Sequence, residues 1–297
     1  MNTKLMKRIF CLLLILCCAP LLHGQGIPER CVKDSLRYKG ADHVYWVHVP
    51  DSLSADGALL ICLHGYGGSA AHGKTQLIDL ADKHGFVVCY PQGLKDGRGK
   101  PCWNVGYPFQ EDLRTDDVGL MEKLVWALVR RYSLNPVNAF LTGMSNGGEM
   151  CYLVARKKPR LFAGIMSIAG LTLPNMEPLH YDTPVPFMEV HGTADKTSKW
   201  EGDPENKDGW GAYLSVPAAV SYVVSANRCH SYSKTTLPLL RNPVTFHRYQ
   251  GGAPARSNGK PCEVWFYEVE GGGHNWSDQD MDTYGEMWKF MDHYMNR

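Results

Sequence analysis

The sequence predicts an α/β protein, built as one domain around a mostly parallel, doubly wound sheet. Short apolar runs typical of strands alternate with segments whose apolar residues recur at helical spacing. The strand runs are apolar at nearly every position, which is expected where helices cover both faces of a parallel sheet. The chain of 297 residues shows no internal repeat and no low-complexity linker, so we assign all of these elements to a single domain.

The predicted elements alternate along the chain. Strands are expected at residues 44–49, 58–63, 86–90, 138–142, 164–168, 186–190, 245–249 and 264–269, the first two being the first strands of the fold. One helix is expected over residues 77–84, and another begins at Thr115, whose hydroxyl would cap it while Asp116 and Asp117 favour the positive end of its dipole. A closing helix carries Met287, Phe290, Met291 and Tyr294 at helical spacing.

The N-terminus resembles a secretory signal. Lys4, Lys7 and Arg8 precede the apolar residues 9–18, a run that is too short for a comfortable membrane span. The sequence therefore predicts a signal peptide over residues 1–24, a functional domain over 25–297, and a secreted or periplasmic protein. A lipid anchor at Cys17 or Cys18 is the less favoured alternative, and no later segment is long and apolar enough to span a bilayer.

Composition excludes several functions. A formal net charge of +1 without basic runs gives no electrostatic reason to expect a nucleic-acid partner. No paired cysteine spacing and no His/Asp/Glu cluster suits a metal ion, so neither a metal nor another cofactor is predicted. Seven of the ten cysteines remain after the signal, and this odd number implies at least one free thiol. The sequence makes no prediction of the oligomeric state.

The most informative stretch is the Gly-x-Ser-x-Gly motif from Gly143 to Gly147. It stands between the predicted strand 138–142 and a helix-like segment that starts at Glu149. A strand, this motif and a helix in succession are typical of a nucleophile elbow, a turn so tight that side chains flanking the serine would clash. The motif predicts Ser145 as a nucleophile with an exposed hydroxyl.

A serine nucleophile needs a base and an acid, and two later loops supply candidates. Asp195 follows the strand 186–190, and His274 follows the strand 264–269 after three glycines. The order Ser, Asp, His, each after a strand, is that of a hydrolase triad on this architecture. His274 would take the proton from Ser145, and Asp195 would hold the imidazole tautomer. Asp116 and Asp117 precede the nucleophile and already serve the start of a helix.

The oxyanion hole is expected to consist of backbone amides. We predict those of Asn146, which follows the nucleophile, and of Tyr66, in the glycine-rich loop after the strand 58–63. His64 is expected to brace that loop. His191 shares the loop of Asp195 and is expected to order it by hydrogen bonding.

Several motifs together resemble one family. The sequence is similar to the polyhydroxybutyrate depolymerase-like esterases over roughly residues 35–295. That family overlaps the carbohydrate esterase family that includes feruloyl and acetylxylan esterases. The motifs that carry the resemblance are Leu63-His64-Gly65, Cys102-Trp103-Asn104, Asp116-Asp117-Val118, Gly143-Met144-Ser145-Asn146-Gly147-Gly148, His191-Gly192-Thr193-Ala194-Asp195 and Gly271-Gly272-Gly273-His274-Asn275-Trp276. The resemblance implies an α/β-hydrolase fold, secretion, and a triad of Ser145, Asp195 and His274.

The resemblance also implies features outside the triad. Members often carry a disulfide near the C-terminal end, and Cys229 and Cys262 resemble that pair. The chain departs from the family after Asp195, where Val-Pro-Tyr is usual, and the polar residues 196–212 resemble a variable insertion, with Trp200 and Trp210 as candidate aromatic contacts. Trp103 and Trp276 are further candidates for contacting a phenolic acid or a sugar.

The predicted function is a secreted serine esterase that removes feruloyl or acetyl groups from plant cell-wall polysaccharide such as arabinoxylan, by way of an acyl-enzyme. The predicted partner is therefore an ester-substituted polysaccharide or oligosaccharide. One alternative is a short-chain polyhydroxyalkanoate depolymerase. A more remote alternative is a non-catalytic carbohydrate-binding protein, which an intact triad disfavours.

Overall fold

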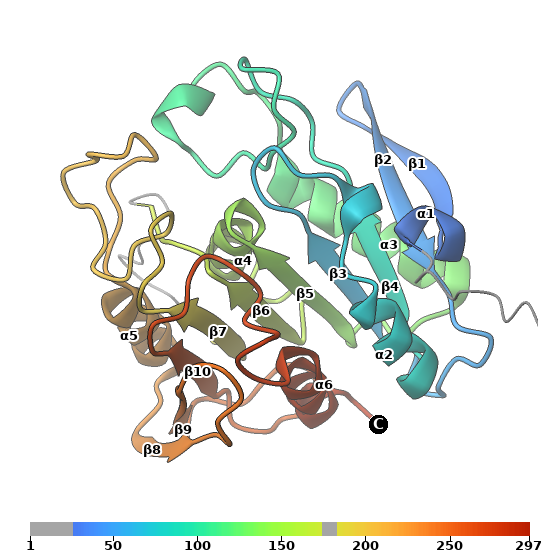
Figure 1. Cartoon of the computed structure of the whole chain (residues 1–297). Helices are drawn as coiled ribbons and strands as arrows, with labels where there is room; N and C mark the ends of the chain where they lie inside the picture. The colour runs from blue at the N-terminus through green and yellow to red at the C-terminus, as the bar shows by residue number, and fades with distance from the viewer. Residues whose placement is uncertain (1–25, 174–182) are drawn as a thin grey trace, which may run out of the picture.

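In the computed structural model, which describes residues 26–173 and 183–297, one sheet of ten strands forms the centre of the fold (Figure 1). The order across the sheet is β1-β2-β4-β3-β5-β6-β7-β10-β9-β8. The strands are β1 (Val32–Tyr38), β2 (Ala41–His48), β3 (Leu59–Leu63), β4 (Val87–Pro91), β5 (Ala139–Met144), β6 (Gly164–Ile168), β7 (Phe187–Gly192), β8 (Ser231–Thr236), β9 (Val244–Gln250) and β10 (Val264–Val269). The predicted α/β fold with a mostly parallel sheet is confirmed.

Parallel pairing is confined to the middle of the sheet. Strands β4, β3, β5, β6, β7 and β10 run parallel, whereas β1 and β2 on one side and β9 and β8 on the other pair antiparallel. The carboxyl ends of the parallel strands therefore meet at one edge, where such sheets place their ligand sites. The prediction that residues 44–49 form the first strand is wrong, because β1 precedes it as an edge strand whose side chains are mostly exposed.

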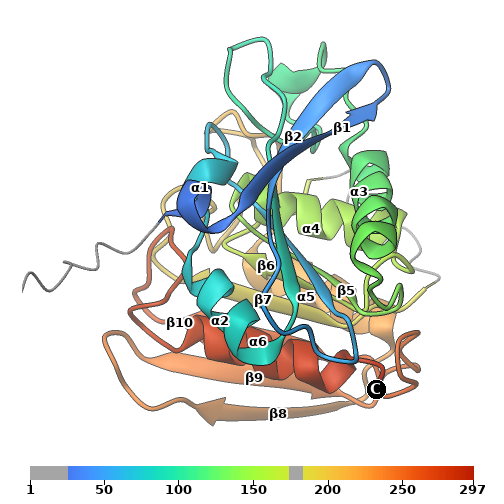
Figure 2. The ribbon, with the colours of Figure 1, turned by 90° about the vertical axis from the view of Figure 1, so that its right-hand side faces the viewer.

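Helices cover both faces of the sheet, as Figure 2 shows from the side. Helices α3 (Asp117–Tyr132), α4 (Asn146–Lys157) and α5 (Val216–Asn227) pack with one hydrophobic cluster. Helices α1 (Ile27–Arg30), α2 (Gln76–His84) and α6 (Thr283–Tyr294) pack with the cluster on the other face. Two short 3-10 helices, η1 (Ala70–His72) and η2 (Pro108–Gln110), lie in the loops. No helix among residues 26–173 and 183–297 combines the length and the apolar composition needed to cross a bilayer.

The start of α3 differs by one residue from the prediction. Asp116, not Thr115, is the cap, because its Oδ1 accepts the amide hydrogen of Gly119 at 2.9 Å. The hydroxyl of Thr115 instead donates to Oδ2 of Asp117 at 3.0 Å. An aspartate whose side chain reaches the third helical amide is as good a cap as threonine, so the predicted helix is present with a neighbouring residue as its cap.

Candidate active site

Ser145 lies in a strained turn between β5 and α4. Its backbone angles are φ 58° and ψ −123°, a region that residues other than glycine occupy rarely and mostly at functional sites. A Cβ on Gly143 would lie 2.5 Å from the carbonyl carbon of Gly147, and a Cβ on Gly147 would lie 2.6 Å from the carbonyl oxygen of Leu63. Both flanking glycines are therefore required by close backbone approach, as the motif predicts.

Asp195 and His274 meet at the carboxyl ends of β7 and β10. Nδ1 of His274 lies 2.7 Å from Oδ2 of Asp195. The carboxylate is fully buried, while the imidazole keeps about a fifth of its side chain exposed. The two loops are joined by their backbones, because the amide of Ala194 donates to the carbonyl of Gly272 at 2.9 Å. This pairing follows from the sheet order, in which β7 and β10 are parallel neighbours.

The second carboxylate oxygen of Asp195 fixes its own loop. Oδ1 accepts the amide hydrogens of Thr197 and Ser198 at 2.8 and 2.9 Å. These two bonds leave Oδ2 directed at His274. The imidazole Nδ1–H then donates to Oδ2, so Nε2 carries the free lone pair that a general base needs.

A second buried pair stands behind Asp195. Nδ1 of His191 lies 3.0 Å from a carboxylate oxygen of Glu189, and its Nε2 lies 2.8 Å from the carbonyl oxygen of Ser198. Burial disfavours a charge on His191, but the bond to Glu189 and the attraction of its charge outweigh burial and raise the pKa of the imidazole. The prediction that His191 orders the loop by hydrogen bonding is confirmed.

The glycine-rich loop after β3 packs against the elbow. A Cβ on Gly65 would lie 3.4 Å from the Cβ of Ser145. His64 braces this loop as predicted, since its Nδ1 is paired with the carbonyl of Gly65 at 2.7 Å and its Nε2 accepts the amide hydrogen of Gly93 at 3.0 Å. Among the residues that the structure describes, the amides of Tyr66 and Asn146 have no hydrogen-bond acceptor, which leaves both donors available to a ligand.

Trp103 is not a substrate contact. Its side chain is completely buried, and its indole N–H donates to the carbonyl oxygen of His64 at 2.9 Å. Its backbone amide donates to Oδ1 of Asn146 at 2.7 Å. Trp103 therefore holds the loop of His64 and the residue after Ser145 in place, and the prediction that it contacts a substrate is wrong.

Trp276 lines a cavity. It lines a space of about 440 Å³ together with Gly65, Lys74 and Met144. Its indole stacks on Tyr284 at a centroid distance of 6.3 Å, and the ammonium group of Lys74 lies 5.7 Å from the ring centroid. The side chain of Trp276 is mostly buried.

A smaller pocket contains Ser145 itself. It has a volume of about 10 Å³, and its walls are Tyr107, Glu149, Leu171, Thr197, Ser198 and Trp210. The insertion predicted over 196–212 supplies three of these residues. The other tryptophan of that insertion, Trp200, instead packs on Phe266 at a centroid distance of 5.8 Å. The sequence analysis missed Tyr107, Glu149 and Leu171, although an acidic residue one helical turn after Ser145 in an otherwise apolar helix was a readable signal.

Glu149 is buried with an uncharged partner. The hydroxyl of Tyr107 donates to its carboxylate, and Nδ2 of Asn146 lies 3.4 Å from the same oxygen. Burial raises the pKa of Glu149 to about 7, although these two bonds act against the shift. The carboxyl group therefore titrates near neutral pH in the wall of the pocket of Ser145.

This raised pKa predicts a pH-dependent stability. Between the usual pKa of glutamate and a pKa of about 7, the carboxyl group of Glu149 is protonated in the folded chain and ionised in the unfolded chain. The free energy of unfolding is therefore highest below this pH window and falls as pH rises through it. We expect Glu149→Gln to remove up to about 3 kcal/mol of the fall in unfolding free energy between pH 4.5 and pH 8. Urea unfolding at both pH values, with the exposed Glu111→Gln as control, measures this; equal falls in both variants would contradict it.

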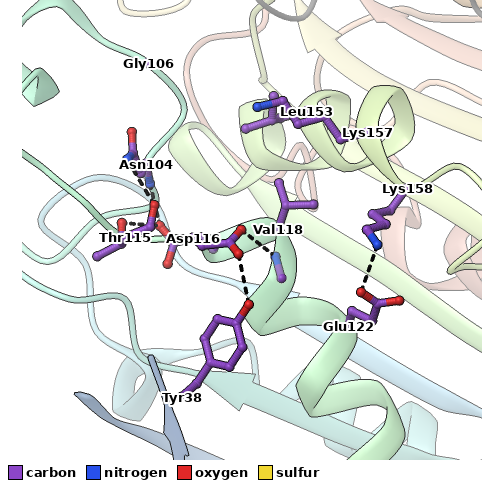
Figure 3. A pocket seen from close by; sticks show the side chains of 12 residues that line it. Tyr38, Asn104, Gly106, Thr115, Asp116, Val118, Glu122, Leu153, Lys157 and Lys158 are labelled. Atoms are coloured by element: carbon purple, nitrogen blue, oxygen red, sulfur yellow. Dashed lines mark hydrogen bonds and ion pairs between the residues drawn. The ribbon is translucent and has the colours of Figure 1, made fainter. Parts of the chain in front are cut away.

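Asp116 and Asp117 line a separate cavity at the start of α3. This cavity of about 400 Å³ lies between α3, α4 and Tyr38 (Figure 3). Asp116 accepts the hydroxyl of Tyr38 at 2.9 Å, and Lys158 pairs with Glu122 across α3 and α4 at 2.9 Å. Asp117 is buried and accepts the amide hydrogen of Asn104 at 2.7 Å. Both aspartates thus serve the helix start, as predicted.

The implied disulfide is not formed. Cys229 and Cys262 are free cysteines in the structure. They are nevertheless neighbours, because the thiol of Cys229 lies 3.4 Å from the carbonyl oxygen of Cys262. Cys262 is buried, and the hydrogen bond replaces the covalent link that the resemblance implies. Within residues 26–173 and 183–297, no group of three or more His, Cys, Asp or Glu side chains could hold a metal ion.

The central parallel sheet with helices on both faces, the elbow and the loop pair after β7 and β10 are those of the α/β-hydrolase fold. Residues 45–178 of the chain match the family described as "Esterase PHB depolymerase". The predicted resemblance is confirmed.

Known proteins agree with this placement. The chain is 26% identical over 276 residues to a bifunctional acetylxylan esterase/xylanase of Neocallimastix patriciarum, covering 88% of this chain and 35% of that protein. It is 28% identical over 134 residues to feruloyl esterase B of Neurospora crassa, covering 42% of this chain and 43% of that enzyme. The chain thus spans less than half the length of either relative.

A solved structure supports the fold. The acetyl xylan esterase from Aspergillus awamori superposes with a TM-score of 0.59 over 87% of this chain and 98% of that one, at 16% identity.

Proposed function

We propose that this chain is a secreted serine esterase that removes feruloyl or acetyl groups from plant cell-wall polysaccharide such as arabinoxylan. The observation that carries the proposal is the 2.7 Å contact between His274 and the buried carboxylate of Asp195, at the same sheet edge as the strained Ser145. Secretion rests on the charged and apolar N-terminal sequence, which lies outside the described residues. Residues 25–297 form the catalytic domain in this proposal.

The proposed reaction proceeds through an acyl-enzyme. Nε2 of His274 takes the proton of the Ser145 hydroxyl as Oγ attacks the ester carbonyl carbon, and Asp195 stabilises the imidazolium that forms. The intermediate collapses when the bond to the alcohol oxygen breaks and that oxygen receives the proton from Nε2. Water then attacks the acyl-serine with His274 as base, which releases the carboxylic acid and restores Ser145.

The developing oxyanion is assigned to the backbone amides of Tyr66 and Asn146. Neither amide donates to another described group. The side chain of Asn146 is held by Trp103 through its Oδ1 at 2.7 Å, so the residue that follows the nucleophile has a fixed position. Donors held in place before the reaction stabilise charge without the cost of reorganisation, and one such donor is worth roughly 10²–10³ in kcat.

The substrate class rests on relatives and on Trp276. The relatives are named as acetylxylan and feruloyl esterases. Trp276, which lines the cavity of about 440 Å³, is an aromatic residue of the kind that sugars and phenolic groups contact. A short-chain polyhydroxyalkanoate depolymerase is the second candidate, because the matching family is described by that activity.

The test is a panel of esters with the purified chain. We expect release of acetate from acetylated xylan or of ferulate from feruloylated arabinoxylan to exceed hydrolysis of hydroxybutyrate oligomers. Preferred hydrolysis of the oligomers would establish the second candidate. Binding to xylan without hydrolysis of any ester would support a carbohydrate-binding protein and refute the esterase.

A further inference from the structure

Four aromatic side chains form a cluster beside Ser145, and two of them, Tyr107 and Trp210, line its pocket. The rings of Tyr66, Tyr107, Phe109 and Trp210 pack against one another with centroids 5.0 to 6.2 Å apart. They come from three segments that are distant in sequence: the loop after β3, the loop between β4 and α3, and the insertion after Asp195. We refer to these four residues as the aromatic cap.

Trp210 is the member of the aromatic cap that comes from the insertion, and its backbone is fixed. The next residue, Gly211, has φ +104°, and a Cβ there would lie 2.8 Å from the side chain of Leu173. Its amide donates to the side chain of Asn206 at 2.7 Å. The insertion is also tied to itself by the pair of Lys199 and Asp208 at 2.6 Å. These contacts hold Trp210 in one wall of the pocket of Ser145.

The pocket that this wall encloses is small. Trp210, Tyr107 and Leu171 leave about 10 Å³ around Ser145 and Glu149, whereas the cavity lined by Trp276 has about 440 Å³. An acetyl group needs little room, but a hydroxycinnamoyl group carries a planar ring that would overlap the space of the indole. Overfilling a packed pocket is costly because neighbouring side chains must leave their preferred rotamers.

The two spaces suit the two halves of an ester. The leaving oxygen must lie at Nε2 of His274 to receive its proton, so the alcohol half lies toward the loop that carries His274 and Trp276. The pocket that contains Ser145 itself then remains for the acyl half. We infer that Trp210 limits the acyl group to a short aliphatic one such as acetyl, while the sugar lies toward Trp276. This inference rests on the proposed esterase function and selects one of its two acyl groups.

The experiment compares 4-nitrophenyl acetate, butyrate and ferulate, which share one leaving group. We expect the wild-type chain to prefer acetate over butyrate by at least about tenfold in kcat/KM, and over ferulate by more. Trp210→Ala should lower the preference for acetate over butyrate at least about tenfold, and Trp210→Phe should lie between. Trp126→Ala, a tryptophan on α3 that is 43% exposed, should leave the preference unchanged.

The outcomes separate the two proposals. If the wild-type chain hydrolysed the ferulate ester as fast as the acetate ester, that result alone would overturn the role of Trp210. An unchanged preference for acetate over butyrate in folded Trp210→Ala and Trp210→Phe would overturn it as well. In both cases the esterase itself would stand. If the wild-type chain hydrolysed none of the three esters, the proposed function would fail.

Discussion

Ser145→Ala is expected to lower kcat for every ester by about 10⁴-fold or more, because it removes the hydroxyl that would form the acyl-enzyme. The fold should survive, since the side chain of Ser145 makes no capping hydrogen bond with α4. The measurement is the steady-state rate on 4-nitrophenyl acetate, together with the mass of the chain after treatment with an organophosphonate. The wild-type chain should gain one adduct, and Ser145→Ala should gain none.

A matched serine variant gives the control. Ser225 lies exposed on α5, and Ser225→Ala should keep full activity and the same adduct. If Ser145→Ala retained more than about a tenth of the wild-type rate with an unchanged melting temperature, the nucleophile would be another residue, because removal of a true nucleophile costs orders of magnitude.

The central fold was predictable because burial on both faces leaves a clear sequence pattern. The strands at 164–168 and 264–269 were predicted with the bounds that the structure gives them. Edge strands leave no such pattern: every side chain of β8 is exposed, and β1 is mostly exposed. Helix α5 was also missed, although its residues are strongly apolar, because its apolar positions are not confined to one face.

In the site, too, some residues could be predicted from the sequence and others could not. Ser145, Asp195 and His274 each follow a strand, and the strand order of the sheet then decides which loops meet. Trp103 was misassigned because its burial depends on contacts with His64 and Asn146 that are remote in sequence. Glu149 and Tyr107 were missed for the same reason, since their pairing joins α4 to a loop about forty residues earlier.

Asp195→Asn is expected to lower kcat by about 10⁴-fold while leaving the fold intact. The carboxamide oxygen can keep the bonds that Oδ1 accepts from the amides of Thr197 and Ser198. The reverse orientation would direct an NH₂ group at those two donors, so the amide nitrogen must face Nδ1 of His274. That nitrogen donates to Nδ1 and forces the imidazole proton onto Nε2, where it blocks acceptance of the proton from Ser145.

Three variants distinguish catalysis from loop support. Asp195→Asn should keep the wild-type melting temperature. Asp195→Ala should lower it, because the amides of Thr197 and Ser198 lose their acceptor, at a cost of about 1–3 kcal/mol for the buried amide of Ser198. The control is Asp79→Asn, which removes an exposed carboxylate on helix α2 that pairs with Arg30. This variant should change neither activity nor stability measurably. Substantial activity in folded Asp195→Asn would show that His274 needs no negative charge at Nδ1, and Asp195 would then only support its loop.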